Sequence, residues 1–155
     1  MPSRRARIVV VATFAVTALA GCSDDGGTSK EDFVAAADEV CREADEAIAD
    51  IGQPRVEEGI LDYVEQAAEI SDDLIADLRA LEPPEADQEA VDGMIDDLER
   101  ATELIEPLAQ ATLDRDADEV EDLQQEVQQV TDDVSEFAET YGFEVCGAKV
   151  LDPIR

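Results

Sequence analysis

Residues 120–141 read VEDLQQEVQQVTDDVSEFAETY, and this stretch decides the fold because its apolar residues recur at alternating steps of three and four. Such spacing places them on one face of an α-helix. The face consists of Val120, Leu123, Val127, Val130, Val134, Phe137 and Tyr141. Asp116 with Glu119 fits the capping pair of a helix start, and Gly142 fits a helix end. The sequence therefore predicts an amphipathic helix over 117–141.

Two segments nearer the start of the chain show the same helical period. The first covers about 30–51, with Ser29 in the N-cap position and Gly52 directly after its last apolar residue. The second begins near Pro54, a residue suited to a first helical turn, and continues until Pro83-Pro84 stops it. Both segments are predicted to be amphipathic helices.

A third segment, about 85–113, has the same period but contains Pro107. Proline lacks the backbone N–H group that a helix interior needs, so we expect Pro107 to kink this helix or to break off its last turns. Because short turns join the four predicted helices, the simplest way to bury their apolar faces is an up-down-up-down antiparallel four-helix bundle. The bundle is expected over 30–147, followed by a loosely held tail over 148–155.

The start of the chain has the layout of a secretory signal peptide. Three arginines lie within residues 1–7, and an apolar run over 8–20 follows. This run is too short to span a bilayer, which needs about 20 residues in a helix. The stretch Leu19-Ala20-Gly21-Cys22 resembles the bacterial lipobox. That resemblance implies that residues 1–21 are removed and that Cys22 receives a diacylglyceryl group.

A lipidated Cys22 would anchor the protein to the extracytoplasmic face of the cell membrane, with residues 22–29 as a flexible tether. Two cysteines then remain, Cys41 and Cys146, in an oxidising compartment. In an up-down-up-down bundle the end of the fourth helix returns to the start of the first helix. We therefore expect a Cys41–Cys146 disulfide; the alternative is two free, buried thiols.

The charge of the chain is strongly negative. Eleven Lys and Arg residues, less the three arginines before residue 22, leave eight bases against 41 acids, a net charge of −33. Such a charge disfavours nucleic acid and anionic lipid as partners. It favours basic proteins, weakly and non-specifically bound cations, or simple solvation.

The residues that most enzymes use are scarce. The chain has no histidine and no tryptophan, which removes Ser-His and Cys-His pairs, HExxH zinc sites and the Glu-x-x-His motif of di-iron bundles. The run Asp114-Arg115-Asp116-Ala117-Asp118 matches the start of a calcium loop. It then fails, because Glu119 replaces the required glycine and Gln125 replaces the bidentate glutamate. We therefore expect no catalytic residue, no cofactor and no specific metal site.

The predicted fourth helix carries nine acids and neither lysine nor arginine. Like charges one turn apart oppose helix formation mildly, so packing of the apolar face must offset them. One interpretation is a docking face for a basic protein or a cell-envelope component; the other is a solvated face in an acidic protein. The candidate docking residues are Asp118, Glu119, Asp122, Glu126, Asp132, Asp133 and Glu136.

Three short patterns lie in the predicted bundle: Asp38-x-x-Cys41-x-x-Ala44, Leu78-x-x-Leu81-x-Pro83-Pro84, and Tyr141-Gly142-Phe143-Glu144-Val145-Cys146-Gly147. Together with the lipobox-like start, the chain resembles small helical lipoproteins of high-GC Gram-positive bacteria. That group is uncharacterised, so the resemblance implies no activity. We expect a non-catalytic, lipid-anchored binding module; the alternative is a passive anionic envelope protein that buffers cations or holds water without a specific partner.

Overall fold

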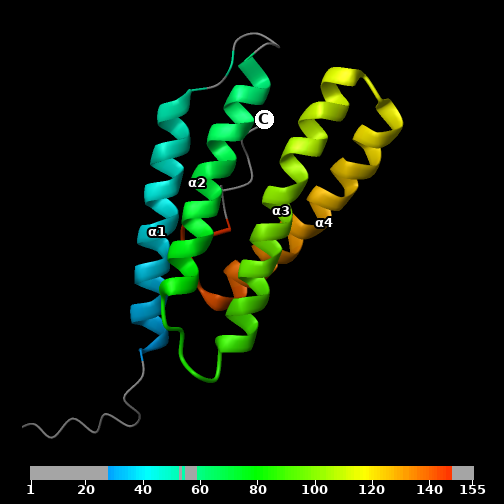
Figure 1. Ribbon diagram of the computed structural model, residues 1–155. Helices are drawn as coiled ribbons and strands as arrows, with labels where there is room; N and C mark the ends of the chain where they lie inside the picture. The colour runs from blue at the N-terminus through cyan, green and yellow to red at the C-terminus, as the bar shows by residue number, and fades with distance from the viewer. Residues whose placement is uncertain (1–27, 53, 55–58, 148–155) are drawn as a thin grey trace, which may run out of the picture.

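The computed structural model describes residues 28–52, 54 and 59–147, and within these residues the chain is all-α. Helix α1 covers Lys30–Ile51, α2 Ile60–Ala80, α3 Gln88–Asp114 and α4 Ala117–Tyr141. Successive helices run in opposite directions (Figure 1). The predicted antiparallel four-helix bundle with one disulfide is confirmed. The predicted signal peptide over 1–21, lipidated Cys22 and tail over 148–155 lie outside the described residues.

The helix ends agree with their sequence signals at most positions. The Ser29 side chain accepts a hydrogen bond from the Asp32 N–H group, and Asp116 accepts one from Glu119. Gly142 closes α4 in the left-handed region, with φ of 103°. Side-chain caps and a C-terminal glycine satisfy backbone groups that a helix cannot pair internally. Local chemistry therefore defines both ends of α4.

The predicted start of the second helix was wrong, because α2 begins at Ile60 instead of near Pro54. Gly59 occupies the N-cap position, and a Cβ atom built on it would lie 3.3 Å from the Pro54 Cβ atom. Pro54 therefore lies against the start of α2. Glycine also has low helix propensity, which favours a boundary at this position.

Of the two effects expected of Pro107, the loss of the last turns of the third helix was wrong, and a kink stays a prediction. Helix α3 continues through Pro107 to Asp114. Because Pro107 has no backbone N–H group, the carbonyl group of Glu103, four residues earlier, loses its helical hydrogen bond. Both residues are exposed, so water can solvate that carbonyl group. On the opposite face Leu104, Leu108 and Ala111 are buried, which holds the last turns in place.

The main core gathers at one end of the bundle. It combines the first half of α1, the second half of α2, the first half of α3, the second half of α4 and the loop after α4. We call this part, residues 30–44, 70–98 and 131–147, the closed end. The remaining described residues of the helices, 45–51, 60–69 and 99–130, form the divergent end. The largest fully buried side chains all belong to the closed end: Leu78, Ile95, Val91, Val134, Cys41 and Cys146.

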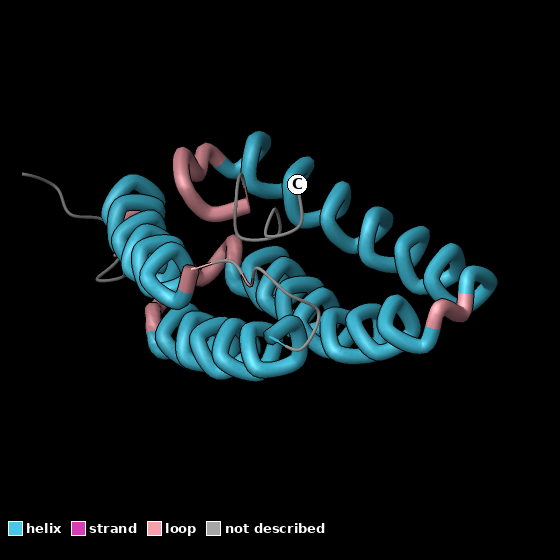
Figure 2. The backbone as a smooth tube through the Cα atoms, turned by 90° about the horizontal axis from the view of Figure 1, so that it is seen from above, coloured by secondary structure: helices cyan, strands magenta, loops and turns pink. Residues whose placement is uncertain are grey.

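Helices that are consecutive in sequence pack side by side, whereas α1 and α4 form no comparable interface. Seen from the side and from above, the α3–α4 hairpin leans away from α1 and α2 towards its own connecting turn (Figures 1 and 2). The loop after α4 joins α4 to α1 at the closed end. The bundle is therefore closed at one end and open at the other.

Candidate functional site

The acidic face of α4 is the candidate docking surface, and its geometry follows from the helix itself. With 100° of rotation per residue, the seven predicted docking residues fall within an arc of about 140°, one edge of which adjoins the apolar face. Six of them are exposed and Glu126 is partly buried: the exposed ones are Asp118, Glu119, Asp122, Asp132, Asp133 and Glu136. Helix α4 thus presents two groups of exposed carboxylates to solvent, one over 118–122 and one over 132–136, with Glu126 between them.

Glu126 differs from the other six because it contacts α3. The Arg100 Nε atom lies 3.1 Å from Glu126 Oε1, and Arg100 also reaches Glu103 at 3.4 Å. The hydrogen bond and the charge of Glu126 raise the pKa of Arg100. Glu126 therefore serves the α3–α4 interface, which reduces its part in any docking surface.

Two carboxylates, Asp97 on α3 and Asp133 on α4, interact across the α3–α4 interface. Burial is the main cause of a raised pKa at Asp97 on α3, and the charges of Asp133 and Asp96 raise it further. The α2–α3 interface has the opposite arrangement, since Arg79 lies 2.9 Å from Asp96 and 2.6 Å from Glu99. Asp133 therefore belongs to a locally crowded group of carboxylates, where negative potential is concentrated.

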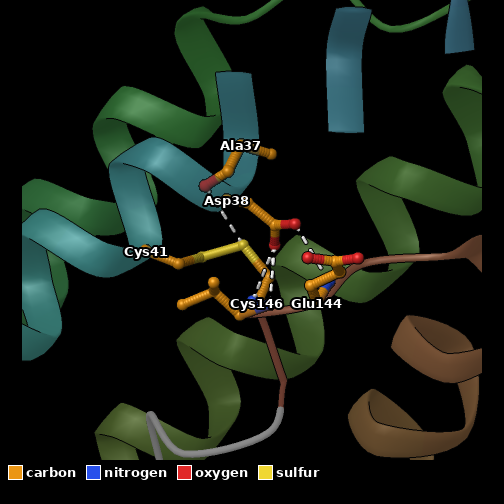
Figure 3. The surroundings of a disulfide bond; sticks show 6 residues. Ala37, Asp38, Cys41, Glu144 and Cys146 are labelled. Carbon is orange, nitrogen blue, oxygen red and sulfur yellow. Dashed lines mark hydrogen bonds between the residues drawn. A yellow bond between two sulfur atoms is a disulfide. The ribbon is translucent and has the colours of Figure 1, made fainter. Parts of the chain in front are cut away.

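The disulfide joins α1 to the loop after α4 (Figure 3). Cys41 and Cys146 are 0 % and 2 % exposed, and their Cα atoms lie 5.4 Å apart. The predicted pairing is thus present in the structure, at the closed end. Because both sulfur atoms are buried, the bond is a structural link between the first and last helices.

Sequence analysis missed the role of Asp38, one turn before Cys41. Its side chain is 8 % exposed and accepts three backbone hydrogen bonds from the loop, at 2.9 Å from Glu144 N, 2.9 Å from Val145 N and 3.0 Å from Cys146 N (Figure 3). Successive N–H groups that converge on one carboxylate form an anion-binding nest. Asp38 therefore fixes the loop whose cysteine closes the disulfide. The sequence signal for this role was that Asp38, an acidic residue, lies next to Ala37 and one turn before Cys41, both of which are buried.

An aromatic cluster completes the closed end. It consists of Phe33, Phe137, Tyr141 and Phe143. Tyr141 and Phe143 contact each other, and each also contacts Phe33 and Phe137, with ring centroids 5.2 to 6.3 Å apart. The Tyr141 hydroxyl donates a hydrogen bond to Asp87 Oδ2 at 2.9 Å, and Lys30 Nζ lies 4.0 Å from the Tyr141 ring centroid. Burial, and secondarily the Asp87 carboxylate, raise the pKa of Tyr141 to about 12.

Other possible sites are sparse in the part of the chain that the structure describes. No group of three or more Cys, Asp or Glu side chains there is arranged to hold a metal ion. A shallow surface hollow lies along the N-terminal part of α3 and the turn before it, lined by Glu85, Gln88, Glu89, Asp92, Gly93 and Asp96. None of the described helices is long and apolar enough to cross a membrane.

Comparisons with known proteins add nothing to this geometry. No protein-family model, curated protein or solved structure matches the chain.

Proposed function

We propose that the protein is a lipid-anchored, extracytoplasmic binding module without catalytic activity. It is held to the membrane through Cys22 and binds a basic protein or a cell-envelope component through the acidic face of α4. The resemblance to helical lipoproteins of high-GC Gram-positive bacteria supports the anchor, and the absence of histidine from the sequence supports a non-catalytic role. No cofactor or nucleic acid forms part of the proposal.

The exposed carboxylates on α4 carry the docking proposal. Nine acids lie on this helix with no lysine or arginine among them, and Arg100 on α3 engages only Glu126 of the seven docking residues. A group of negative side chains that no nearby base neutralises attracts a positively charged partner and raises its rate of association. A basic segment would relieve repulsion that the helix otherwise retains.

The anchor would orient this surface. The tether over 22–29 would enter the bundle at Lys30, which belongs to the closed end. The seven residues 23–29 that follow the lipidated Cys22 have a root-mean-square reach of roughly 15 Å, so the closed end would lie near the membrane. The α3–α4 turn and the first half of the α4 face would then point away from the lipid. A partner in the cell envelope could reach them there.

A second candidate is a passive anionic envelope protein, and one observation favours it. Acids are spread over all four helices, and α1 and α3 each carry eight. A surface that is acidic on every side needs no specific partner to attract water and cations. The two candidates therefore differ in whether the position of the acids on α4 matters.

The deciding experiment is covalent crosslinking on intact cells that express the lipidated protein, followed by purification and mass spectrometry. The test variant neutralises five exposed acids of α4: Asp118→Asn, Asp122→Asn, Asp132→Asn, Asp133→Asn and Glu136→Gln. The matched control neutralises five exposed acids of α2: Asp62→Asn, Glu65→Gln, Glu69→Gln, Asp72→Asn and Asp73→Asn. Both variants change the net charge by the same amount. A Cys22→Ala version provides the unanchored control.

The docking proposal predicts one recurrent partner that crosslinks to the wild-type protein and to the α2 variant but is lost with the α4 variant. Loss of that partner in the Cys22→Ala version would support the anchor. Equal loss with both charge variants, or no enriched partner at all, would favour the passive role. A partner that survives the α4 changes and is lost with the α2 changes would place the docking surface on α2.

A further inference from the structure

The loop after α4 is fastened to α4 by contacts that do not involve α1. The Phe143 N–H group donates to the Ala138 carbonyl oxygen at 3.0 Å. Ser135 Oγ donates to the Gly147 carbonyl oxygen at 3.2 Å. Gly147 has φ of 86°, and a Cβ atom built on it would lie 2.6 Å from Ala138 Cβ, so glycine permits this close approach. Because these contacts need only α4 and the loop, they can form before the disulfide does.

The junction of this loop with α1 suits a reduced chain as well as an oxidised one. Asp38 accepts backbone hydrogen bonds from residues 144–146 at 2.9 to 3.0 Å, and none of these bonds involves sulfur. Cys146 Sγ lies 3.2 Å from the Ala37 carbonyl oxygen (Figure 3). A disulfide sulfur has no hydrogen to donate, but the thiol of a reduced Cys146 has one. The loop can therefore dock on α1 with its cysteine still reduced.

The two cysteines differ in how a reagent can reach them. Cys41 lies in the middle of α1, so its exposure requires that this helix part from the rest of the bundle. Cys146 is also buried, but it lies in a loop between exposed Glu144 and partly exposed Gly147. Opening of a loop costs less free energy than displacement of a packed helix. Cys146 is therefore the more accessible thiol of a folded, reduced chain.

We propose that the disulfide forms in the folded chain, that Cys146 reacts first with a disulfide oxidant, and that Asp38 is the positioning residue that returns Cys146 to Cys41. The Cys146 thiolate attacks one sulfur of an oxidant such as glutathione disulfide, which forms a mixed disulfide and releases one thiolate. The Cys41 thiolate then attacks Cys146 Sγ, which forms the protein disulfide and releases the second thiolate. The two cysteines thus lose two electrons to the oxidant, and the protons that they lose are balanced by those that the released thiolates take up.

Shared loop closure is the physical basis for the role of Asp38. The hydrogen bonds to Asp38 and the disulfide fix the same loop against α1, so the first link raises the effective concentration at which the second forms. Without Asp38, Cys146 would meet Cys41 less often. This inference is independent of the docking proposal, because Asp38 and both cysteines lie outside the acidic face of α4.

The order of reaction is tested with single-thiol variants. In the purified chain with Cys22→Ser, adding Cys41→Ser leaves only Cys146, and adding Cys146→Ser leaves only Cys41. Sucrose, which favours compact states, is added until circular dichroism shows that every reduced chain is helical. With glutathione disulfide as the probe, mass spectrometry should show that Cys146 forms its mixed disulfide at least about tenfold faster than Cys41. An equal or faster reaction of Cys41 would overturn the proposed order.

The role of Asp38 is tested at equilibrium in the same solution, with both cysteines present. Mixtures of reduced and oxidised glutathione set the ratio of dithiol to disulfide, and mass spectrometry after acid quenching gives the effective concentration of the two thiols. Asp38→Asn should lower it about tenfold or more, because the two links are coupled. The control, Leu104→Ala, removes a buried side chain at the divergent end and should change the effective concentration by less than about twofold.

Two results would overturn the positioning role of Asp38. One is an effective concentration that Asp38→Asn leaves unchanged. The other is an equal decrease with Asp38→Asn and Leu104→Ala, which would show that general stability, and not the position of the loop, controls the bond. These measurements need neither a partner nor the acidic face of α4, so this proposal and the docking proposal can fail separately.

Discussion

The two halves of α4 have the same sequence pattern but different surroundings. Val134, in the second half, is 1 % exposed and lies in the main core, whereas Val127, two turns earlier on the same face, is partly exposed. The second half meets α1 through the loop after α4, and the first half packs against α3 while α1 and α2 diverge from it (Figure 2). An apolar face therefore becomes a core only where a third and a fourth element close over it.

What closes the bundle is a small set of long-range links. The disulfide and the three hydrogen bonds to Asp38 all join α1 to the loop over 144–146. They lie within one turn of each other on α1, so they act on the same junction. If this account is right, changes at this junction cost far more stability than changes of the same kind at the divergent end.

The largest loss is expected from removing the disulfide. The Cys41–Cys146 bond spans 105 residues, so in the chain-entropy model a Cys41→Ala/Cys146→Ala variant should lose about 4 to 5 kcal/mol of unfolding free energy. Urea denaturation followed by circular dichroism measures this loss. A change below about 1 kcal/mol would mean that packing alone closes the bundle.

The next largest loss is expected from Asp38→Asn, which turns one carboxylate oxygen into an N–H donor that faces backbone N–H groups. Buried donors would lose a charged acceptor, at a cost of about 2 to 4 kcal/mol. Glu43→Gln, an exposed change on the same helix, is the control and should shift stability by less than about 0.5 kcal/mol. Similar urea midpoints for the two variants would show that Asp38 does not stabilise the closed end.

A matched pair of core substitutions compares the two halves of α4 directly. Val134→Ala removes buried methyl groups and should destabilise by about 2 to 3 kcal/mol, while Val127→Ala should cost about 1 kcal/mol or less. Helix propensity changes equally in both, because both replace valine by alanine in the same helix. Equal losses in thermal or urea unfolding would show that the first half is as well covered as the second.

The smallest expected effect concerns the Tyr141–Asp87 hydrogen bond. At neutral pH, Tyr141→Phe should cost about 0.5 to 1.5 kcal/mol. The folded-state pKa of Tyr141 is raised from 10.0 to about 12, so the folded chain holds this proton more tightly than the unfolded chain. The wild-type advantage should therefore be complete below pH 10 and should be lost as the pH rises towards 12.

Stability of wild type and Tyr141→Phe, measured side by side from pH 8 to 12, tests this prediction. Tyrosinate absorbance should show one group that ionises well above the ordinary range in the wild type and none in the variant. An advantage of the wild type that stays constant up to pH 12 would contradict the pKa of Tyr141 and its structural cause.

Much of the fold follows from short-range information, which sequence carries well. Helical period placed all four helices, and Ser29, Asp116 and Gly142 marked their ends correctly, because caps depend on neighbouring residues. The disulfide followed from cysteine count and helix order. Pro54 did not mark the start of the second helix, and Pro107 did not end the third one early. Whether a proline ends a helix depends on whether the affected backbone group reaches water, and that depends on packing.

The candidate site was predictable only in part, for a related reason. The acidic face of α4 is visible in sequence because it lies on one helix. The engagement of Glu126 by Arg100, and of Asp38 by a loop more than 100 residues away, requires knowledge of which helices meet. The unequal closure of the two ends also escaped prediction, since the apolar period is the same along the whole of α4.

Amide hydrogen exchange along α4 in the protein with its disulfide formed tests the central claim most directly. The account predicts that amides over 131–141 exchange only by near-global unfolding, and that amides over 120–128 exchange faster, through local opening of the divergent end. Removing the disulfide with Cys41→Ala/Cys146→Ala should make the exchange rates of the two halves of α4 more similar. Uniform protection along α4 in the oxidised protein would contradict the division into a closed and a divergent end.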